Sequence, residues 1–167
     1  MTYTIRPVRP SDLAAVTEVE AICFPAAEAA TGESFKARIA AFPECFFVAE
    51  SEGKIIGFIN GCATDSKTIC DEMYENSACH KTDGAYQSTF GLDVLPDYQR
   101  QGIAADLMNH MIGDAKNKGR KGLILTCKDR LIHYYAKFGY KNMGVSESVH
   151  GGAVWYDMIL EFGAQES

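Results

Sequence analysis

The sequence predicts an α/β fold with a mixed β-sheet, and three observations support this prediction. Apolar runs of strand length alternate along the chain with segments in which apolar residues recur every three or four positions. The clearest helical segment begins at Ile103 and separates two strand-like runs. The second of these runs, GLILT at 122–126, is uninterrupted, as is typical of a buried parallel strand. A strand, a helix and a parallel strand in this order form a right-handed crossover unit.

The N-terminal half is predicted to form a strand, two helices and a hairpin. Ser11 or Asp12 can cap the first helix, and the pair Phe24-Pro25 ends it. The turn Ser51-Glu52-Gly53-Lys54 joins the two strands of the hairpin. The predicted elements are a strand at 2–8, helices at 13–23 and 33–41, and strands at 45–50 and 55–62.

The C-terminal half begins with a polar, irregular region at 64–85. Gly119 can adopt the left-handed conformation that ends the long helix. The predicted elements are a strand at 86–95, a helix from 103 to about 118, a strand at 122–126, a helix at 130–138, and strands at 140–145 and 153–162. In total we expect about seven strands flanked by about four helices, in a single domain over residues 1–167.

The composition narrows the classes of partner. The net charge of −6 disfavours binding to nucleic acid or to anionic membranes, and it either suits a cationic small molecule or simply keeps the protein soluble. No apolar run reaches the roughly 18 residues that cross a bilayer, and the N-terminal residues do not resemble a signal peptide, so we expect a cytoplasmic protein. The six cysteines contain no C-x-x-C pair, so we expect no metal site.

The junction between the strand at 86–95 and the long helix carries the strongest chemical signal. The first turn of a helix has unpaired N–H groups and the positive end of the helix dipole, which together bind phosphate-like anions. Gly102 has no Cβ, so an anion can reach the backbone there. Arg100 adds a positive charge, and Gln99 and Gln101 add hydrogen-bond donors. A plain turn between a strand and a helix is the alternative interpretation.

The pattern Gln-x-x-Gly-x-Ala at 99–104 resembles the pyrophosphate loop, Q/R-x-x-G-x-G/A, of the GNAT N-acetyltransferase superfamily. Two further segments share the resemblance: YYAKFGY at 134–140 is similar to the family's Y-x-x-F-G-F/Y segment, and IRPVRPSD at 5–12 to its first strand and helix cap. The resemblance spans nearly the whole chain. Within the superfamily, CFPA at 23–26 and LIHYY at 131–135 resemble the arylalkylamine (serotonin-type) N-acetyltransferases.

The resemblance implies that acetyl-CoA lies in a gap where the strand before the loop splays away from its parallel neighbour. Backbone groups of Leu92 and Val94 would then pair with the pantetheine arm, as an added strand would. The residues implied to hold the pyrophosphate are Gln99, Arg100, Gln101, Gly102, Ile103, Ala104 and Ala105.

The implied reaction is direct attack of an amine on the thioester in a ternary complex. It requires a base for the amine proton, donors for the developing oxyanion and an acid for the leaving thiolate. Tyr135 falls on the family's acidic tyrosine, and a phenol is a suitable donor to a thiolate of similar basicity. The alternative is that Tyr135 is a core aromatic residue.

The general base is where the sequence departs from the arylalkylamine pattern. Those enzymes carry two histidines on the strand before the loop, and this chain has Ser88 and Phe90 there. Serotonin-type specificity is therefore in doubt. Asp93 is one residue out of phase with Leu92 and Val94, so we expect its side chain on the other face of the sheet. The candidates that remain are a chain of waters, Glu72, His80 and His150.

The acceptor site is expected to form from the segments 24–29, 64–85 and 146–152, with Phe24, Glu28 and Phe90 as substrate-binding candidates. The predicted acceptor is the primary amine of a small molecule, of the arylalkylamine or polyamine type. Acceptors of another class (an amino acid, an aminoglycoside or a protein N-terminus) and a low-turnover acyl-CoA-binding module are the alternatives. The sequence leaves open whether the chain forms a homodimer.

Overall fold

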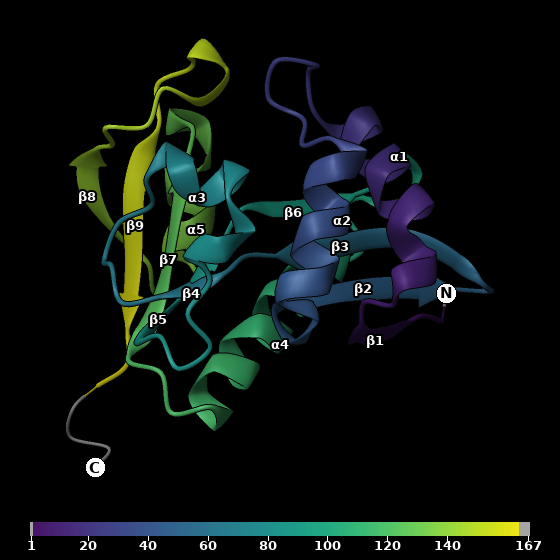
Figure 1. Cartoon of the computed structure of the whole chain (residues 1–167), viewed down its shortest axis with the longest axis horizontal. Helices are drawn as coiled ribbons and strands as arrows, with labels where there is room; N and C mark the ends of the chain where they lie inside the picture. Colours follow the sequence, from purple (N-terminus) through teal and green to yellow (C-terminus); the bar gives the residue numbers. More distant parts are fainter. Residues whose placement is uncertain (1, 164–167) are drawn as a thin grey trace.

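The computed structural model describes residues 2–163 and shows two β-sheets with helices around them (Figure 1). The helices are α1 (Leu13–Cys23), α2 (Gly32–Ala41), α3 (Asp71–Glu75), α4 (Ile103–Asn117) and α5 (Ile132–Ala136). The strands are β1 (Thr4–Pro7), β2 (Phe46–Ser51), β3 (Lys54–Asn60), β4 (Ala63–Thr64), β5 (Tyr86–Thr89), β6 (Gly91–Val94), β7 (Gly122–Cys127), β8 (Lys141–Val145) and β9 (Tyr156–Glu161). No helix within these residues has both the length and the apolar composition needed to span a membrane.

The strand pairing confirms the α/β class and the mixed sheet arrangement. One sheet has the order β1-β2-β3-β6, and the other has the order β4-β5-β7-β9-β8. β5 and β7 are parallel, and α4 connects them through β6, so the predicted crossover is present. The other strand pairs are antiparallel.

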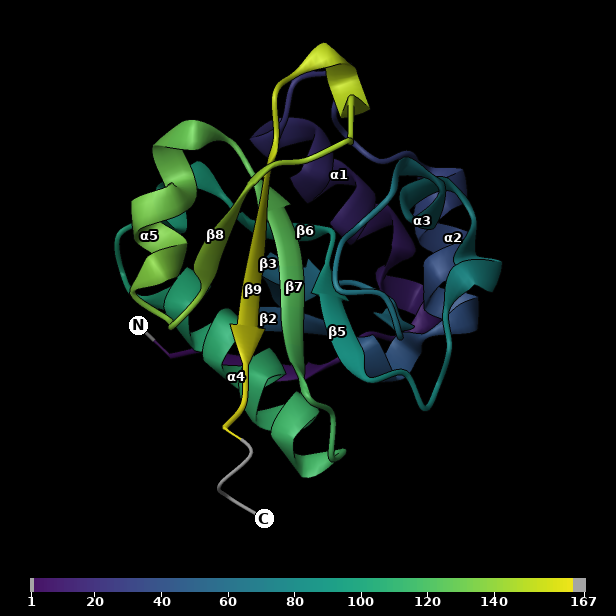
Figure 2. The ribbon, with the colours of Figure 1, turned by 90° about the vertical axis from the view of Figure 1, so that its left-hand side faces the viewer.

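The single strand predicted at 86–95 is wrong in one respect, because it is two strands in different sheets. β5 pairs with β7, whereas β6 pairs with β3, and Phe90 lies at the break. Gly91 follows the break, and a side chain there would be crowded, because a Cβ would lie 3.1 Å from a side-chain oxygen of Asp93. The two sheets therefore diverge after Phe90, and β6 and β7 leave a gap between them (Figures 1 and 2).

Three other predictions need correction. The region 64–85 is not wholly irregular, since it contains α3, which buries Met73. The strand predicted at 45–50 begins one residue later, because Cys45 belongs to the helical turn that Pro43 starts. The last strand begins at Tyr156 rather than Ala153, because the preceding residues form the short turn at 150–152. The divided strand and the two-residue β4 account for the excess over about seven strands.

The hydrophobic core lies on both faces of the sheet that contains β6. On one face, α4 buries Leu107, Met108 and Met111 completely, and each such side chain contributes roughly 1.5–3 kcal/mol. On the other face, α1 and α2 pack Val16 and Phe35 against the strands. These two layers hold β6 and the start of α4 in place on one side of the gap. Gly119 has a φ of +76°, which confirms the predicted left-handed end of α4.

Candidate active site

The edge of β6 that faces the gap pairs with no other strand of the described residues, and on it Val94 O accepts only from the side chains of Gln99 and Cys23. Leu95 donates its N–H to Ile56 O on β3, and backbone direction alternates along a strand. The backbone of Asp93 therefore faces β3, whereas those of Leu92 and Val94 face the gap. The open edge matches the predicted pairing with an extended arm, and that pairing itself stays a prediction.

The loop before α4 forms a cradle of free N–H groups. The first hydrogen bond into the helix is from Asp106 N to Gly102 O, and the N–H groups of 100–105 have no partner among the residues that the structure describes. Gly102 has a φ of +85°, and a Cβ there would contact nothing within 4 Å. Arg100 also has a positive φ, +64°. This left-handed backbone turns successive N–H groups toward one open space, which is the geometry of an anion site.

The side chain of Gln99 holds the loop in place and does not offer its amide group to an anion in the cradle. Its side-chain amide donates to Val94 O at 3.0 Å, so it ties the loop to the end of β6. The thiol of Cys23 donates to the same oxygen at 3.4 Å. Both contacts set the position of the loop relative to β6.

A cavity of about 210 Å³ opens beside this edge, between the two sheets. It takes residues from α1, α2, α3, both halves of the divided strand, β7 and α5. Its lining includes the predicted acceptor residues Phe24, Glu28 and Phe90, together with Glu20, Arg38, Tyr74, Glu75, Leu92, Thr126, Cys127, Tyr135, His150 and Trp155. Segments more than 100 residues apart in the chain meet there. Within the described residues, no group of three or more His, Cys, Asp or Glu could hold a metal ion.

Tyr135 lies on α5 and lines the cavity, whereas its neighbour Tyr134 does not. Their rings meet edge to face with centroids 5.1 Å apart. Burial, followed by the neighbouring Tyr134, raises the pKa of Tyr135 well above that of a free phenol. The hydroxyl therefore keeps its proton at neutral pH, as an acid must.

Cys127, the last residue of β7, is a second side chain in the cavity wall that could give up a proton. Its thiol is buried, and burial raises its pKa to about 11. A protonated, desolvated thiol is a poor nucleophile. The cysteine therefore forms part of the cavity wall and does not suit covalent catalysis.

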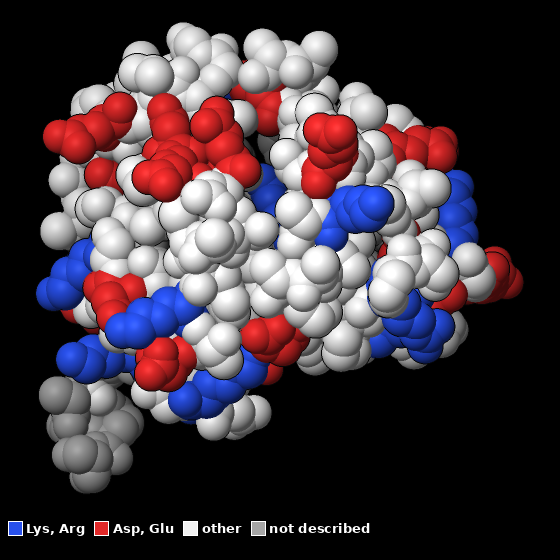
Figure 3. All heavy atoms as spheres, in the orientation of Figure 1, with Lys and Arg blue, Asp and Glu red and all other residues white. Residues whose placement is uncertain are grey.

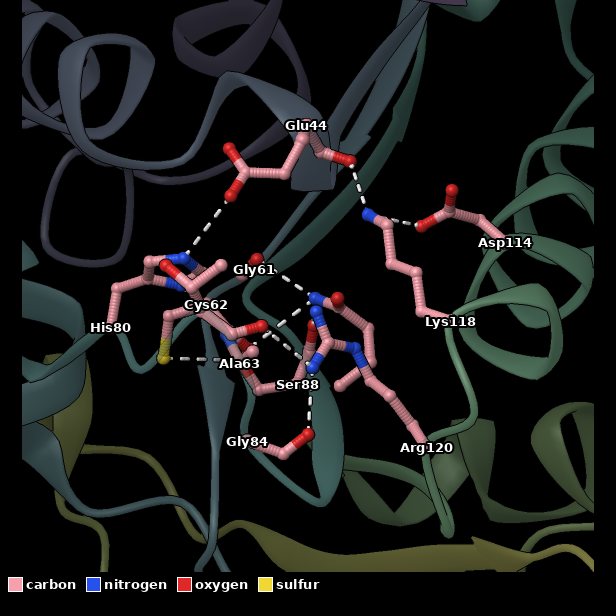
Figure 4. A network of polar contacts seen from close by, with 12 residues as sticks. Glu44, Gly61, Cys62, Ala63, His80, Gly84, Ser88, Asp114, Lys118 and Arg120 are labelled. Atoms are coloured by element: carbon pink, nitrogen blue, oxygen red, sulfur yellow. Dashed lines mark hydrogen bonds and ion pairs between the residues drawn. The ribbon is translucent and has the colours of Figure 1, made fainter.

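The two positions that hold histidines in arylalkylamine enzymes differ in their surroundings. The Ser88 side chain is fully buried and its hydroxyl donates to Cys62 O at 2.8 Å, so it joins β5 to the chain after β3 (Figure 4). Phe90 lines the cavity, and its ring lies 4.9 Å from that of Tyr74. Ser88 is structural, and Phe90 contributes an apolar wall.

The structure distinguishes the three remaining candidates for the general base, because only one of them lines the cavity. His80 lies in the network of Figure 4, where Nδ1 accepts from Ala63 N at 3.0 Å and Nε2 points toward Glu44, and neither residue lines the cavity. Glu72 is exposed on α3 and does not line the cavity. His150 does line it, but its Nε2 lies 2.9 Å from Glu28 O, which requires Nε2 to carry the proton.

Sequence reasoning did not predict that three titratable residues come together at the cavity. Glu20 and Arg38 line it, and Asp93 lies behind them. Asp93 is on the opposite face from Leu92 and Val94, as predicted, but that face is the one that α1 covers with Glu20. The available signal was an acidic residue on the apolar face of α1, one position after Val19.

The chain matches the family model described as "Acetyltransferase (GNAT) family" over residues 13–140. It is 29% identical over 105 residues to human N-acetyltransferase 8. The matched region is 61% of this chain but only 40% of that relative. The chain thus spans less than half the length of this curated relative.

Two solved structures show the same fold. The GphF GNAT-like decarboxylase in complex with isobutyryl-CoA has a TM-score of 0.82 at 21% identity, with 95% of this chain and 98% of that chain covered. The PaiA N-acetyltransferase from Thermoplasma acidophilum in complex with coenzyme A has a TM-score of 0.72 at 17% identity, with 97% and 100% covered. These likenesses confirm the predicted GNAT fold, and both proteins bind a coenzyme A compound.

The open edge of β6 and the N–H cradle at the start of α4 fit coenzyme A, because an extended amide arm and a diphosphate need these two features. The arylalkylamine subgroup is not shown by these similarities. The family match covers well over half of the chain and both structural features. The chain belongs to the acetyltransferase (GNAT) family.

Proposed function

We propose that the protein transfers an acetyl group from acetyl-CoA to the primary amine of a small molecule of the arylalkylamine or polyamine type. The observation that carries the proposal is the cavity of about 210 Å³, which has Tyr135 in its wall and lies beside the unpaired edge of β6. When bound, the cofactor would supply an activated acetyl thioester. Leu92, Val94 and the N–H groups of 100–105 would hold and orient it.

Tyr135 is the acid in this proposal. The amine nitrogen forms a bond to the thioester carbon, the carbon–sulfur bond breaks, and the Tyr135 hydroxyl donates its proton to the departing sulfur. The aromatic walls from Phe24, Phe90 and Trp155 exclude water from the reacting atoms. They also suit an acceptor with an apolar or aromatic body.

Two loops, 24–31 and 146–155, line the cavity and contact each other through Glu28 and His150. Both lie at the top of the molecule in Figures 1 and 2, and we call this pair of loops the roof of the cavity. His150 lies 2.9 Å from Glu28 O, and Lys128 pairs with the Glu28 carboxylate at 2.7 Å. The His150 ring also stacks on Tyr74 at 4.9 Å, and Trp155 donates to His150 O. This roof limits the acceptor to a small molecule and disfavours a peptide chain that must pass through it.

The charge around the entrance suits a cationic acceptor. Figure 3 shows acidic side chains gathered on the upper part of one face, beside a hollow between the two halves of the molecule. α3 carries the acidic residues Asp71, Glu72 and Glu75, and Glu75 lines the cavity. Such a field raises the local concentration of ammonium ions.

A thiol-release assay across a panel of amines tests the proposed function. The panel contains phenethylamine, spermidine, an amino acid, an aminoglycoside and a short peptide with a free N-terminus, each with acetyl-CoA. We expect release of free coenzyme A with phenethylamine or spermidine and little with the peptide. Turnover confined to the peptide would assign the protein to N-terminal acetylation. Binding of acetyl-CoA without release on any amine would make the chain an acyl-CoA-binding module.

Substitution Gly151→Ala tests the roof. A Cβ at Gly151 would lie 2.6 Å from Glu28 Cγ and 3.1 Å from Ala27 O, so the two loops must separate. We expect the KM for the small amine to rise about 10-fold, the equivalent of about 1.4 kcal/mol of lost acceptor binding, with acetyl-CoA affinity unchanged.

Gly152→Ala is the matched control for this substitution. Gly152 has a φ of +73°, close to the +63° of Gly151, but a Cβ there would contact nothing within 4 Å. The control therefore carries the backbone strain without the clash. Equal KM values in the two variants would show that the loop contact does not shape the acceptor site.

A further inference from the structure

Four polar residues are buried together where the divided strand changes sheets. Glu20 from α1, Arg38 from α2, Asn60 from β3 and Asp93 from β6 are 7%, 5%, 1% and 1% exposed. Gly91 lies at their centre, since a Cβ there would have Asp93 Oδ1 at 3.1 Å and Asn60 Nδ2 and Glu20 Oε1 both at 3.6 Å. Glu20 and Arg38 line the cavity, so the cluster forms its floor.

The two carboxyl groups of the cluster require a shared proton. Glu20 Oε2 accepts the N–H of Ala30 at 2.9 Å, whereas neither oxygen of Asp93 has a donor among the described residues. Burial, then the charge of Glu20 and a hydrogen bond to it, raise the pKa of Asp93 well above its usual range. A protonated Asp93 that donates to Glu20 satisfies both groups and leaves the charge on Glu20, the member that reaches the cavity.

The positive charge of Arg38 offsets the negative charge of Glu20 within the cluster, but the two side chains form no ion pair. Its guanidinium donates to Asn60 Oδ1 and to Tyr74 O, both at 3.0 Å, and lies 4.8 Å from the centre of the Phe90 ring. No carboxylate of the described residues lies within ion-pair distance of Arg38. The other titratable groups near the cluster are the Cys23 thiol of α1 and the Tyr74 hydroxyl of α3.

We infer that Glu20 binds the ammonium group of the acceptor and accepts its proton, and that Asp93 positions Glu20 for this role. The inference rests on the proposed function and adds the missing base. Glu20 is a buried carboxylate that lines the same cavity as the acid Tyr135. It is free to receive a cation, since its other contacts are the Ala30 N–H and the carboxyl group of Asp93.

All the protons that move during one turnover can be accounted for. The acceptor enters as R–NH₃⁺, and one N–H bond breaks as its proton passes to Glu20, which becomes a neutral carboxylic acid. The resulting R–NH₂ has a free electron pair, which forms the new bond to the thioester carbon. The nitrogen of the adduct loses a second proton to solvent, while Tyr135 supplies the proton that the leaving sulfur takes up. Glu20 returns its proton to solvent when the products leave, and the Tyr135 phenolate takes one proton back from solvent, so each turnover releases one proton in total.

Two acceptors of nearly equal shape separate a proton-accepting role from a structural one. Phenethylamine is an ammonium ion at pH 7, whereas O-benzylhydroxylamine is neutral there and needs no base to enter the reaction. For Glu20→Gln we expect kcat/KM to fall about 100-fold with phenethylamine, within the range of general-base effects. With O-benzylhydroxylamine it should fall less than about 3-fold, because the step that Glu20 performs is not needed.

The pH profile and a control variant complete the test. In Glu20→Gln, kcat/KM with phenethylamine should rise tenfold per pH unit through pH 7–9, since only the free amine then reacts. Glu18→Gln removes the same charge from an exposed position on the same helix and should leave both acceptors unaffected. Equal losses with the two acceptors, or an unchanged profile, would overturn the inference while leaving the proposed function intact. If the wild-type protein acetylates neither acceptor, the proposed function fails instead.

A readout without turnover addresses Asp93. In protein labelled with ¹³C at the aspartate carboxyl carbons, one resonance should keep the shift of a protonated acid at pH 7. That resonance should vanish in Asp93→Asn. Its absence from the wild-type protein would show that Asp93 holds no proton and would remove Asp93 from the role of positioning Glu20.

Discussion

Tyr135→Phe should lower kcat about 100-fold while acetyl-CoA affinity changes little, as expected for loss of a general acid. The substitution removes one hydroxyl and leaves the ring, so the ring contacts of residue 135 with Tyr134 and Tyr140 are retained. Without the phenol proton, the sulfur must leave as a thiolate. Steady-state kinetics with phenethylamine, together with calorimetric titration of coenzyme A, measures both quantities.

Tyr134→Phe is the matched control for the tyrosine experiment. Tyr134 is the adjacent residue on the same helix, and it does not line the cavity. It should keep nearly full turnover. The raised pKa of Tyr135 also means that the wild-type enzyme should show no alkaline loss of activity from this residue up to pH 9. Unchanged turnover in Tyr135→Phe would exclude the hydroxyl from the mechanism.

Gly102→Glu should weaken acetyl-CoA binding about 100-fold. The residue has a φ of +85°, so any side chain strains the backbone of the cradle, and the new carboxylate would stand where the diphosphate belongs. A Cβ at this position meets no protein atom within 4 Å, so the substitution causes no clash within the protein. Direct titration with acetyl-CoA measures the loss of affinity.

Gly119→Glu separates this effect from general instability. Gly119 lies beyond the other end of α4, has a φ of +76° and also has open space around it. The control should lose a comparable amount of thermal stability but bind acetyl-CoA normally. Equal affinities in the two variants would show that the cofactor does not use the N-terminal cradle of α4.

Periodicity and turn residues were sufficient to predict most elements. The helix from Ile103 was predicted because apolar residues recur on one face, and the structure buries that face. The parallel strand at 122–126 was predicted because its residues are all apolar or small, and they are buried between neighbours on both sides. Such local patterns report which face of an element meets a core.

The division of the strand at Phe90 was not predictable from its own residues. Residues 86–94 suit a single extended strand, and the change of partner depends on Cys62, Asn60 and β7, which lie elsewhere in the chain. The contact between the two loops of the roof was not predictable for the same reason. Glu28 and His150 meet although 122 positions separate them, and no local pattern contains that contact.

Sequence alone determined the class of fold and the positions of the glycine loop before α4 and of the tyrosine on α5, because a helix start, a left-handed glycine and a short motif are local features. That the loop holds a diphosphate stays a prediction. Tertiary structure alone decided the floor of the cavity. Glu20 and Asp93 lie 73 positions apart, and each by itself is an acidic residue on a face that should be apolar. Only the packing of α1 on β6 removes water from both, joins them through one proton and directs the remaining charge into the cavity.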